Sequence, residues 1–218
     1  MASPSPAVVL MLKAIQAWDR LRLRARSWQH PGLRIDPAAS SNLAAAHFDL
    51  APTAVLEIGA GVTTERRPAA LRFMLEAGAQ VEVEAGTWLR TQVADVVIWA
   101  GPDARIRIGR EAFLNGCHLS AKSSLSLGYR TQVGYGSRLI DSDQHDLDNT
   151  RTEQSAPIVL GDHVWVAGDV TVLRGVQIGD HAVIGARSLV TADVPAHTLA
   201  FGIPARPQGQ IGDRSQTR

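Results

Sequence analysis

A six-residue repeat of aliphatic positions dominates the C-terminal part of the chain. From residue 160 to residue 195 the sequence reads LGDHVW, VAGDVT, VLRGVQ, IGDHAV, IGARSL and VTADVP. The residues that open the hexads are all aliphatic: Leu160, Val166, Val172, Ile178, Ile184 and Val190. Small or β-branched residues fill the fifth position, which is Val164, Val170, Val176, Ala182, Ser188 and Val194. A short fixed period predicts a solenoid, in which each unit buries its apolar side chains only by stacking on the next unit.

The hexad is too short for a pair of helices, so each hexad is expected to form one flat face of a parallel β-helix. Three hexads then make one triangular turn, with the opening aliphatic pointing inward and the small fifth residue at the corner. The same pattern opens hexads upstream, at Ile108, Leu114, Leu127, Val133 and Leu139. From Val81 to Ile108 apolar and polar residues alternate without a strict period, which indicates irregular first coils. Successive coils are expected to stack about 4.8 Å apart.

The N-terminal segment has a different pattern, which predicts a helix over residues 1–30. Apolar residues recur every two to four positions between Pro6 and Trp28, and the segment is basic through Lys13, Arg20, Arg22, Arg24 and Arg26. A signal peptide would place its positive charge before a longer apolar run. Two interpretations remain, an interfacial helix on an anionic membrane surface and a cap over the open end of the solenoid. We favour the cap, because repeat arrays generally need one.

These patterns divide the chain into four segments. They are the basic amphipathic helix (1–30), a linker (31–54), a β-helix domain (55–206) and a polar tail (207–218). The length of 218 residues fits one domain, and the net charge of +1 implies no nucleic-acid partner. The single cysteine, Cys117, excludes an internal disulfide and fits a reducing compartment. No apolar run reaches the about 20 residues that span a membrane, so we expect a cytoplasmic protein.

An interruption of the repeat carries the candidate chemistry. Between Leu139 and the restart at Leu160 the chain reads IDSDQHDLDNTRTEQSAPIV, which predicts a loop that leaves one corner of the solenoid. His145 lies there among Asp141, Asp143, Asp146 and Asp148. A histidine oriented by carboxylates can act as a general base toward a hydroxyl or an amine. The alternative is an acidic, solvated loop with an incidental histidine, and spacing alone leaves both open.

Several motifs in order resemble the hexapeptide-repeat acyltransferases. They are the hexads, the histidine in DSDQHD, the restart PIVLGDHVWV and the ending VPAHTLAFGIPAR, over roughly residues 106–206. The likeness is to the galactoside, maltose and polysaccharide O-acetyltransferases. It implies a mainly β fold, a left-handed parallel β-helix, although the repeat alone does not give the hand. It also implies a homotrimer with active sites between subunits, and acetyl-CoA as the co-substrate.

The resemblance assigns roles to individual residues. His145 matches the catalytic base, Asn115 matches an asparagine that faces the acceptor and the base, and Asp146 stands where some relatives place a carboxylate that orients the histidine. The positions that match the cofactor site are Trp165, Gly168, Ala186, Thr191 and Arg206. Ala192 and Gly209 depart from the family pattern, because cations are common at these two positions in the family.

We therefore predict an acetyl-CoA-dependent acyltransferase that O-acetylates a sugar or a glycan precursor by direct transfer, with no metal. A zinc enzyme like the γ-carbonic anhydrases would typically need an H-x4-H pair, which is absent. A non-catalytic trimeric scaffold is the other alternative. His163 and His181 lie one turn apart and are expected to stack on an outer face, where solvated histidines are more common than a metal site. The sequence does not identify the acceptor or the length of the acyl chain.

Overall fold

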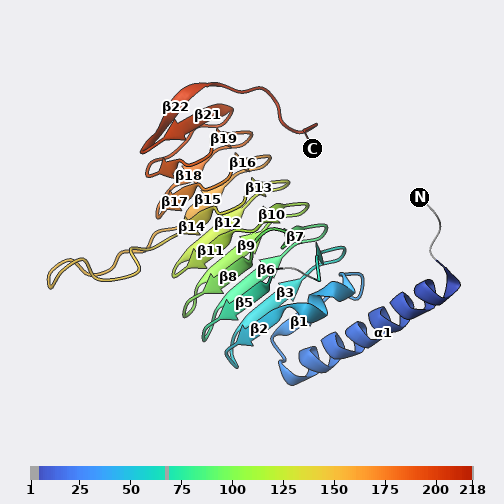
Figure 1. The fold of residues 1–218 in the computed structure, drawn as a ribbon. Helices are drawn as coiled ribbons and strands as arrows, with labels where there is room; N and C mark the ends of the chain where they lie inside the picture. The colour runs from blue at the N-terminus through green and yellow to red at the C-terminus, as the bar shows by residue number, and fades with distance from the viewer. Residues whose placement is uncertain (1–4, 67–68, 218) are drawn as a thin grey trace.

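Three parallel β-sheets wrap the chain into a triangular solenoid in a computed structural model, which describes residues 5–66 and 69–217 (Figure 1). Each turn passes through the sheets in the order A, C, B. Sheet A contains β1 (Leu33–Ile35), β3 (Val55–Ile58), β6 (Gln80–Val83), β9 (Arg105–Ile108), β12 (Ser124–Leu127), β15 (Ile158–Leu160) and β18 (Gln177–Ile178). This arrangement confirms the mainly β class and the parallel β-helix.

The other two sheets follow the same rotation. Sheet C contains β4 (Thr63–Thr64), β7 (Trp88–Arg90), β10 (Phe113–Asn115), β13 (Gln132–Val133), β16 (Trp165–Val166), β19 (Val183–Ile184), β21 (Thr198–Gly202) and β22 (Ala205–Gln210). Sheet B contains β2 (His47–Leu50), β5 (Leu71–Leu75), β8 (Val96–Ala100), β11 (His118–Ala121), β14 (Arg138–Ile140), β17 (Thr171–Leu173) and β20 (Leu189–Val190). The solenoid therefore has three edges, which we name the A–C, C–B and B–A edges after the sheets that meet there.

The core is the column of inward-pointing aliphatic side chains that the hexads predict. Leu160 is in register with Ile178, and Val172 with Val190, so equivalent hexad positions stack directly. All six opening residues are buried, as are the small residues at the fifth position. Because each of these side chains packs on those of the turns before and after it, the repeat itself builds one continuous core.

The linker expected over residues 31–54 is wrong, because this segment forms the first turn. Leu33 on β1 pairs with Leu56, and Phe48 on β2 pairs with Phe73 and stacks on its ring at 5.5 Å. A 3-10 helix, η1 (Ser41–Ala45), takes the place of the strand that sheet C would otherwise have. The Ala- and Ser-rich composition suggests a linker, but Leu43 is fully buried and holds η1 on the core.

The α-helix α1 (Pro6–Gln29) lies across this end of the solenoid (Figure 1). Ser5 caps its N-terminus and Pro6 occupies the first turn, both of which favour helix initiation. Its inner side packs on η1 and β1 through Leu23, and Arg26 donates a hydrogen bond to the Ala46 carbonyl at 2.9 Å. The helix thus covers the first turn, as a cap does. None of the helices over residues 5–66 and 69–217 is long and apolar enough to cross a membrane.

The opposite end is closed by a hairpin, where the polar tail predicted for residues 207–218 is wrong. Strands β21 and β22 pair antiparallel, and β22 continues to Gln210. Residues 211–217, which we call the C-terminal strap, then run back along the A–C edge. Within the strap, Ile211 N–H donates to the His197 carbonyl at 2.7 Å and Arg214 N–H donates to His181 Nδ1 at 3.0 Å. These contacts fix the segment on the surface of the solenoid.

The A–C edge under the strap carries a column of stacked histidines. The His163 and His181 rings lie 4.9 Å apart and nearly parallel, which confirms the predicted stacking. His197 continues the column at 4.7 Å from His181, because the chain places one residue per turn at this corner. Arg214 spans the column by donating through Nε to the His163 carbonyl at 3.2 Å.

Candidate functional site

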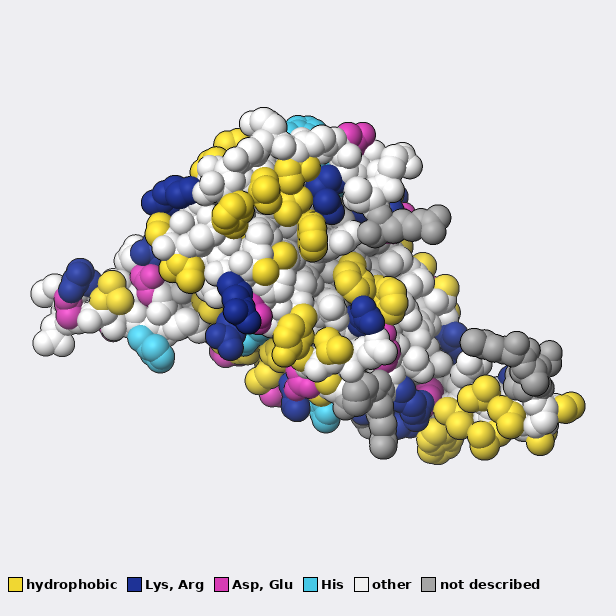
Figure 2. All heavy atoms as spheres, turned by 45° about the horizontal axis from the view of Figure 1, so that its top comes forward, with side chains coloured by type: hydrophobic (Ala, Val, Ile, Leu, Met, Phe, Trp, Pro, Cys, Tyr) yellow, Lys and Arg dark blue, Asp and Glu magenta, His cyan; other side chains and the backbone are white. Residues whose placement is uncertain are grey.

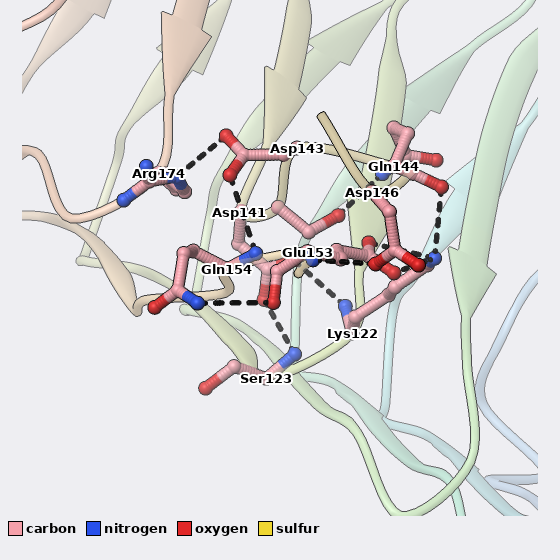
Figure 3. Close-up of polar contacts among 10 residues, drawn as sticks. Lys122, Ser123, Asp141, Asp143, Gln144, Asp146, Glu153, Gln154 and Arg174 are labelled. Atoms are coloured by element: carbon pink, nitrogen blue, oxygen red, sulfur yellow. Dashed lines mark hydrogen bonds and ion pairs between the residues drawn. The ribbon is translucent and has the colours of Figure 1, made fainter. Parts of the chain in front are cut away.

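The loop of residues 141–157 leaves the B–A edge between β14 and β15 and projects from the solenoid (Figure 1). Its base is anchored by Asp141, whose side chain is fully buried and accepts hydrogen bonds from the N–H groups of Lys122 and Ser123, both at 2.7 Å (Figure 3). Burial raises the pKa of Asp141, while these backbone donors act in the opposite direction. The carboxylate therefore ties the loop to the preceding turn of the solenoid.

Two cations clamp the sides of the loop (Figure 3). Lys122 Nζ lies 2.7 Å from Glu153 Oε1 and donates to the Gln144 carbonyl at 3.2 Å. Arg174 Nε donates to Asp143 Oδ1 at 2.7 Å, and this hydrogen bond lowers the pKa of Asp143. Both sides of the loop are thus fixed to solenoid residues that directly follow β11 and β17, which limits where a side chain on the loop can move.

The outer part of the loop is held by its own carboxylates. Asp146 Oδ1 accepts a hydrogen bond from the Glu153 N–H at 2.7 Å, which joins the two limbs. Asp148 accepts from the N–H groups of Thr150 and Arg151, both at 2.9 Å, and from the Arg151 side chain, which together close the tip. Hydrogen bonds to Arg151 and Thr150 lower the pKa of Asp148.

His145 is exposed between these anchored positions and makes no hydrogen bond or ion pair with any residue of the described chain. The predicted role of Asp146 in orienting His145 is not seen, because the carboxylate binds the Glu153 N–H instead. A short acidic side chain in a tight loop satisfies nearby backbone donors first. The loop therefore presents His145 to its surroundings on a braced backbone, with its ring nitrogens available.

A second set of predicted residues lies on a different edge. Asn115 ends β10, and Gly168 and Ala186 follow strands β16 and β19, so all three lie at the C–B edge. Backbone hydrogen bonds run along this edge from turn to turn, with Asp169 N–H donating to the Tyr135 carbonyl at 2.7 Å and Arg187 N–H donating to the Gly168 carbonyl at 3.0 Å. Gly168 and Ala186 share one column of this edge, and Asn115 lies one position before that column.

Two polar groups on the C–B edge have no partner within the described chain. The side-chain oxygen Oδ1 of Asn115 is buried without a hydrogen bond, although Arg90 is its register partner on β7. The Gly168 N–H likewise donates to no acceptor among the described residues. Asn115 Oδ1 is covered by atoms of the chain itself, whereas the Gly168 N–H has no such partner, and a free backbone N–H is the donor type that stabilises an oxyanion.

Trp165 lies on the outer face of sheet C, at the start of β16, and its side chain is 42% exposed. The Arg214 guanidinium lies over its ring, 5.4 Å from the ring centre, in a cation–π arrangement. Burial lowers the pKa of Arg214, which stays far above neutrality as an arginine does. A flat aromatic surface with a cation beside it is suited to an aromatic or anionic ligand.

The remaining predicted residues are dispersed. Thr191 is exposed at the B–A edge directly after β20, and Arg206 is exposed on β22. Ala192 is exposed, and the space where a Gly209 side chain would stand is open. The described chain therefore carries the histidine on one edge and Asn115 with Gly168 on another, and does not bring them together.

Sequence reasoning missed Lys122, Arg174 and Arg214. Lys122 and Arg174 contact the loop from neighbouring turns, and the excess of acids in the loop is the signal that could have indicated cationic partners. Arg214 reaches Trp165 only because the strap folds back, for which the sequence holds no local signal.

A further groove of about 920 Å³ lies between α1 and sheet A, lined by residues such as Arg24, Arg34 and Glu84, and contains none of the predicted site residues.

Within residues 5–66 and 69–217, no three His, Cys, Asp or Glu side chains gather in a way that could hold a metal ion. The stacked histidines face each other through their ring faces, whereas a shared metal would need converging ring nitrogens. Cys117 is buried, and burial raises its pKa to about 12, so it is a packing residue rather than a reactive thiol.

Comparison with known proteins relates the repeat to bacterial transferases. Residues 157–192 match the family described as "Bacterial transferase hexapeptide (six repeats)". The chain is 42% identical over 72 residues to the galactoside O-acetyltransferase of Escherichia coli (strain K12), covering 33% of this chain and 36% of that one. It is 36% identical over 111 residues to a putative acetyltransferase of Schizosaccharomyces pombe, covering 49% and 53%. The chain thus spans about a third to a half of these curated relatives.

Two solved structures share the fold over most of the chain. The polysialic acid O-acetyltransferase OatWY superposes with a TM-score of 0.66 at 14% identity, covering 84% of this chain and 88% of that one. The polySia-specific acetyltransferase NeuO gives a TM-score of 0.52 at 22% identity, covering 79% and 85%. The solenoid is accordingly a left-handed parallel β-helix, as expected.

Proposed function

Because residues 157–192 match the bacterial hexapeptide transferase family, we propose that the protein is an acetyl-CoA-dependent acyltransferase that O-acetylates a sugar or a glycan precursor. One observation carries the proposal. An unpartnered N–H at Gly168 and an unpartnered Oδ1 at Asn115 share an edge of the solenoid, and a braced loop presents His145. An oxyanion donor, an acceptor-binding group and a base are the parts that acyl transfer requires.

The active site forms between subunits of a homotrimer. Within one chain the loop projects from the B–A edge, while Asn115 and Gly168 lie on the C–B edge. A heterologous interface, in which one edge of a subunit meets a different edge of its neighbour, brings His145 to Asn115 of the partner subunit and closes into a ring after three copies.

The reaction proceeds by direct transfer. His145 takes the proton of the acceptor hydroxyl while the hydroxyl oxygen attacks the thioester carbonyl. The Gly168 N–H stabilises the oxyanion of the tetrahedral intermediate, an effect worth about 3–4 kcal/mol for a single donor in other enzymes. The carbon–sulfur bond then breaks, and protonated His145 delivers its proton to the departing thiolate. The products are an acetyl ester and coenzyme A.

Trp165, Ala186, Thr191 and Arg206 are proposed to bind the coenzyme. The exposed ring of Trp165 offers an apolar surface, and Arg206 supplies positive charge. A sugar acceptor is supported by the name of the Escherichia coli relative, a galactoside O-acetyltransferase. The acceptor contacts are proposed to come from the loop of residues 146–158 and from the early turns.

The first experiment measures thiol release from acetyl-CoA over a panel of sugars, nucleotide sugars and amines, with wild type and His145→Ala side by side. We expect substrate-dependent release that falls by about 100-fold or more in the variant, the range for loss of a general base. Equal rates in both proteins would contradict the role of His145.

A non-catalytic trimeric scaffold is the alternative, and the absence of a cation at position 192 favours it. Calorimetric titration with coenzyme A separates the two proposals. Binding that is weakened by Trp165→Ala supports the transferase, and a protein that neither binds coenzyme A nor releases thiol is a scaffold.

A further inference from the structure

Helix α1 leaves one complete face uncovered. Its inner side is defined by Asp19 and Leu23, the two helix residues that are buried. On the opposite side the exposed fractions are 70% for Leu10, 61% for Trp18 and 88% for Trp28. At about 100° per residue these positions fall on one stripe along the helix axis. The full set of large apolar residues on or beside the stripe, which we call the outer face, is Leu10, Met11, Trp18, Leu21 and Trp28.

Basic side chains flank the outer face on both sides. Lys13 and Arg24 lie along one margin of the stripe, and Arg22 lies along the other, as the helical spacing requires. The acid of the helix, Asp19, is buried and forms ion pairs with Arg66 and Arg22. From Pro6 to Gln29, the exposed surface of α1 therefore carries cations and no anion.

This surface is visible as a patch at one end of the molecule. Figure 2 shows hydrophobic side chains gathered over the region where Figure 1 places α1, with Lys and Arg side chains next to them. Exposed apolar area of this kind costs free energy in water and normally marks an interaction site. Packing against the solenoid does not use it, because η1 and β1 contact the other side of the helix.

We propose that α1 is an interfacial anchor that lies in the surface of an anionic membrane. The outer face would enter the boundary between head groups and acyl chains, where tryptophan is favoured, and the cations on both margins would contact lipid phosphates. The negative charge of the lipid head groups complements an apolar stripe that has cations on both of its margins. The anchor lies outside the proposed transferase site, so either proposal can fail without the other.

The test is flotation of the full chain with vesicles of phosphatidylcholine alone, or of phosphatidylcholine and phosphatidylglycerol in equal amounts. We expect binding to the anionic vesicles, weaker binding to the neutral ones, and loss of binding at high salt. Trp18→Glu/Leu21→Glu should abolish the interaction. Gln16→Glu/Gln80→Glu is the matched control, because it adds the same charge at exposed positions outside the outer face.

A second pair of variants tests the charge alone. Lys13→Gln/Arg24→Gln should lower the partition coefficient on anionic vesicles by at least about tenfold, since each cation near such a surface contributes about fivefold. Arg105→Gln/Arg138→Gln removes two exposed cations elsewhere on the solenoid and should leave binding unchanged. Circular dichroism and the melting temperature verify that each variant is folded.

Three results would overturn the proposal. They are no binding of the wild type to either vesicle, equal binding to both vesicles, and equal loss in the control variants. If the wild type does not bind vesicles and the Trp18→Glu/Leu21→Glu variant has a smaller assembly mass in solution than the wild type, the outer face binds a second copy of the chain instead.

Discussion

Asp146, which is next to the proposed base His145, could either orient the histidine or brace the loop backbone. A single hydrogen bond distinguishes these two roles. Its Oδ1 accepts from the Glu153 N–H at 2.7 Å, so its contact is with the backbone of the opposite limb rather than with His145. A carboxylate that oriented His145 would accept a hydrogen bond from one of its ring nitrogens. Asp146 makes no such contact within the described residues.

We therefore expect Asp146→Asn to retain kcat/KM within about twofold, because the amide oxygen can accept the same hydrogen bond without any effect on general-base catalysis. The acidic limb of the pH–rate profile should also stay where it is in the wild type. Asp146→Ala, which removes the acceptor, is the comparison variant and should lower activity by loosening the loop. A displaced pH profile in Asp146→Asn would show that the carboxylate acts on His145 after all.

The inward residues of the hexads could be predicted individually, whereas the contacts of the loop could not. Leu160 and Val166 are buried because their period alone specifies which side of the strand they occupy. The partners of Asp143 and Glu153 are Arg174 and Lys122, which lie 31 residues away in each case. Such pairs depend on how successive turns superpose, which the local sequence around the loop does not encode.

At the level of elements, the C-terminal strap depends on the column of histidines beneath it. Burial, followed by the charge of His181, lowers the pKa of His163 from its ordinary value of 6.5. The unfolded chain therefore takes up this proton at a higher pH than the folded chain does. The stability that the neutral ring contributes is complete above pH 6.5 and is lost as the pH falls through the pKa of the folded state.

This predicts that the melting temperature falls as the pH is lowered from about 7 to about 5, the range in which histidines titrate. His163→Gln, which cannot be protonated, should show a smaller fall. Arg214 Nε donates to the His163 carbonyl, so a change at His163 should also loosen the strap, and hydrogen exchange at the Arg214 amide should accelerate over the same range. Parallel pH dependence in wild type and variant would exclude His163 as the source.

The first turn and the strap are the elements that sequence patterns misassigned. The segment that contains β1 and β2 was predicted to be a linker because both strands are short and are separated by a 3-10 helix instead of a third strand. The strap was predicted to be a free polar tail because its partners are distant in the sequence. For example, Arg130 donates to the Ser215 carbonyl at 2.7 Å, and the two residues are 85 positions apart. Both segments are held by non-local pairing, to which hydrophobic periodicity is insensitive.

For the whole molecule, the separation of the proposed catalytic groups onto two edges predicts complementation between inactive chains. His145→Ala and Asn115→Ala should each be inactive alone. In mixed trimers about a third of the sites would combine an intact His145 from one chain with an intact Asn115 from the next, because the interface is heterologous and one of the three interfaces pairs the two intact residues. Mixed trimers obtained by co-expression of the two variants should thus recover about a third of wild-type activity.

Recovery is measured by thiol release after the mixed trimers are purified through two different affinity tags. Mixing the purified variants without subunit exchange is the control and should remain inactive. Failure of a verified mixed trimer to regain activity would mean that His145 and Asn115 act within the same chain or do not act together.

The two ends of the solenoid also determine how far the array can extend. A parallel β-helix with bare ends offers three rows of unpaired backbone groups, onto which another molecule could add as a further turn. Here α1 and η1 close one end, and the antiparallel strand β22 turns the last edge of sheet C away from the stacking direction. The turns of the solenoid stack on one another within one chain, as in its seven-stranded sheets. Because both ends are covered, whole molecules do not stack end to end into fibres in the same way.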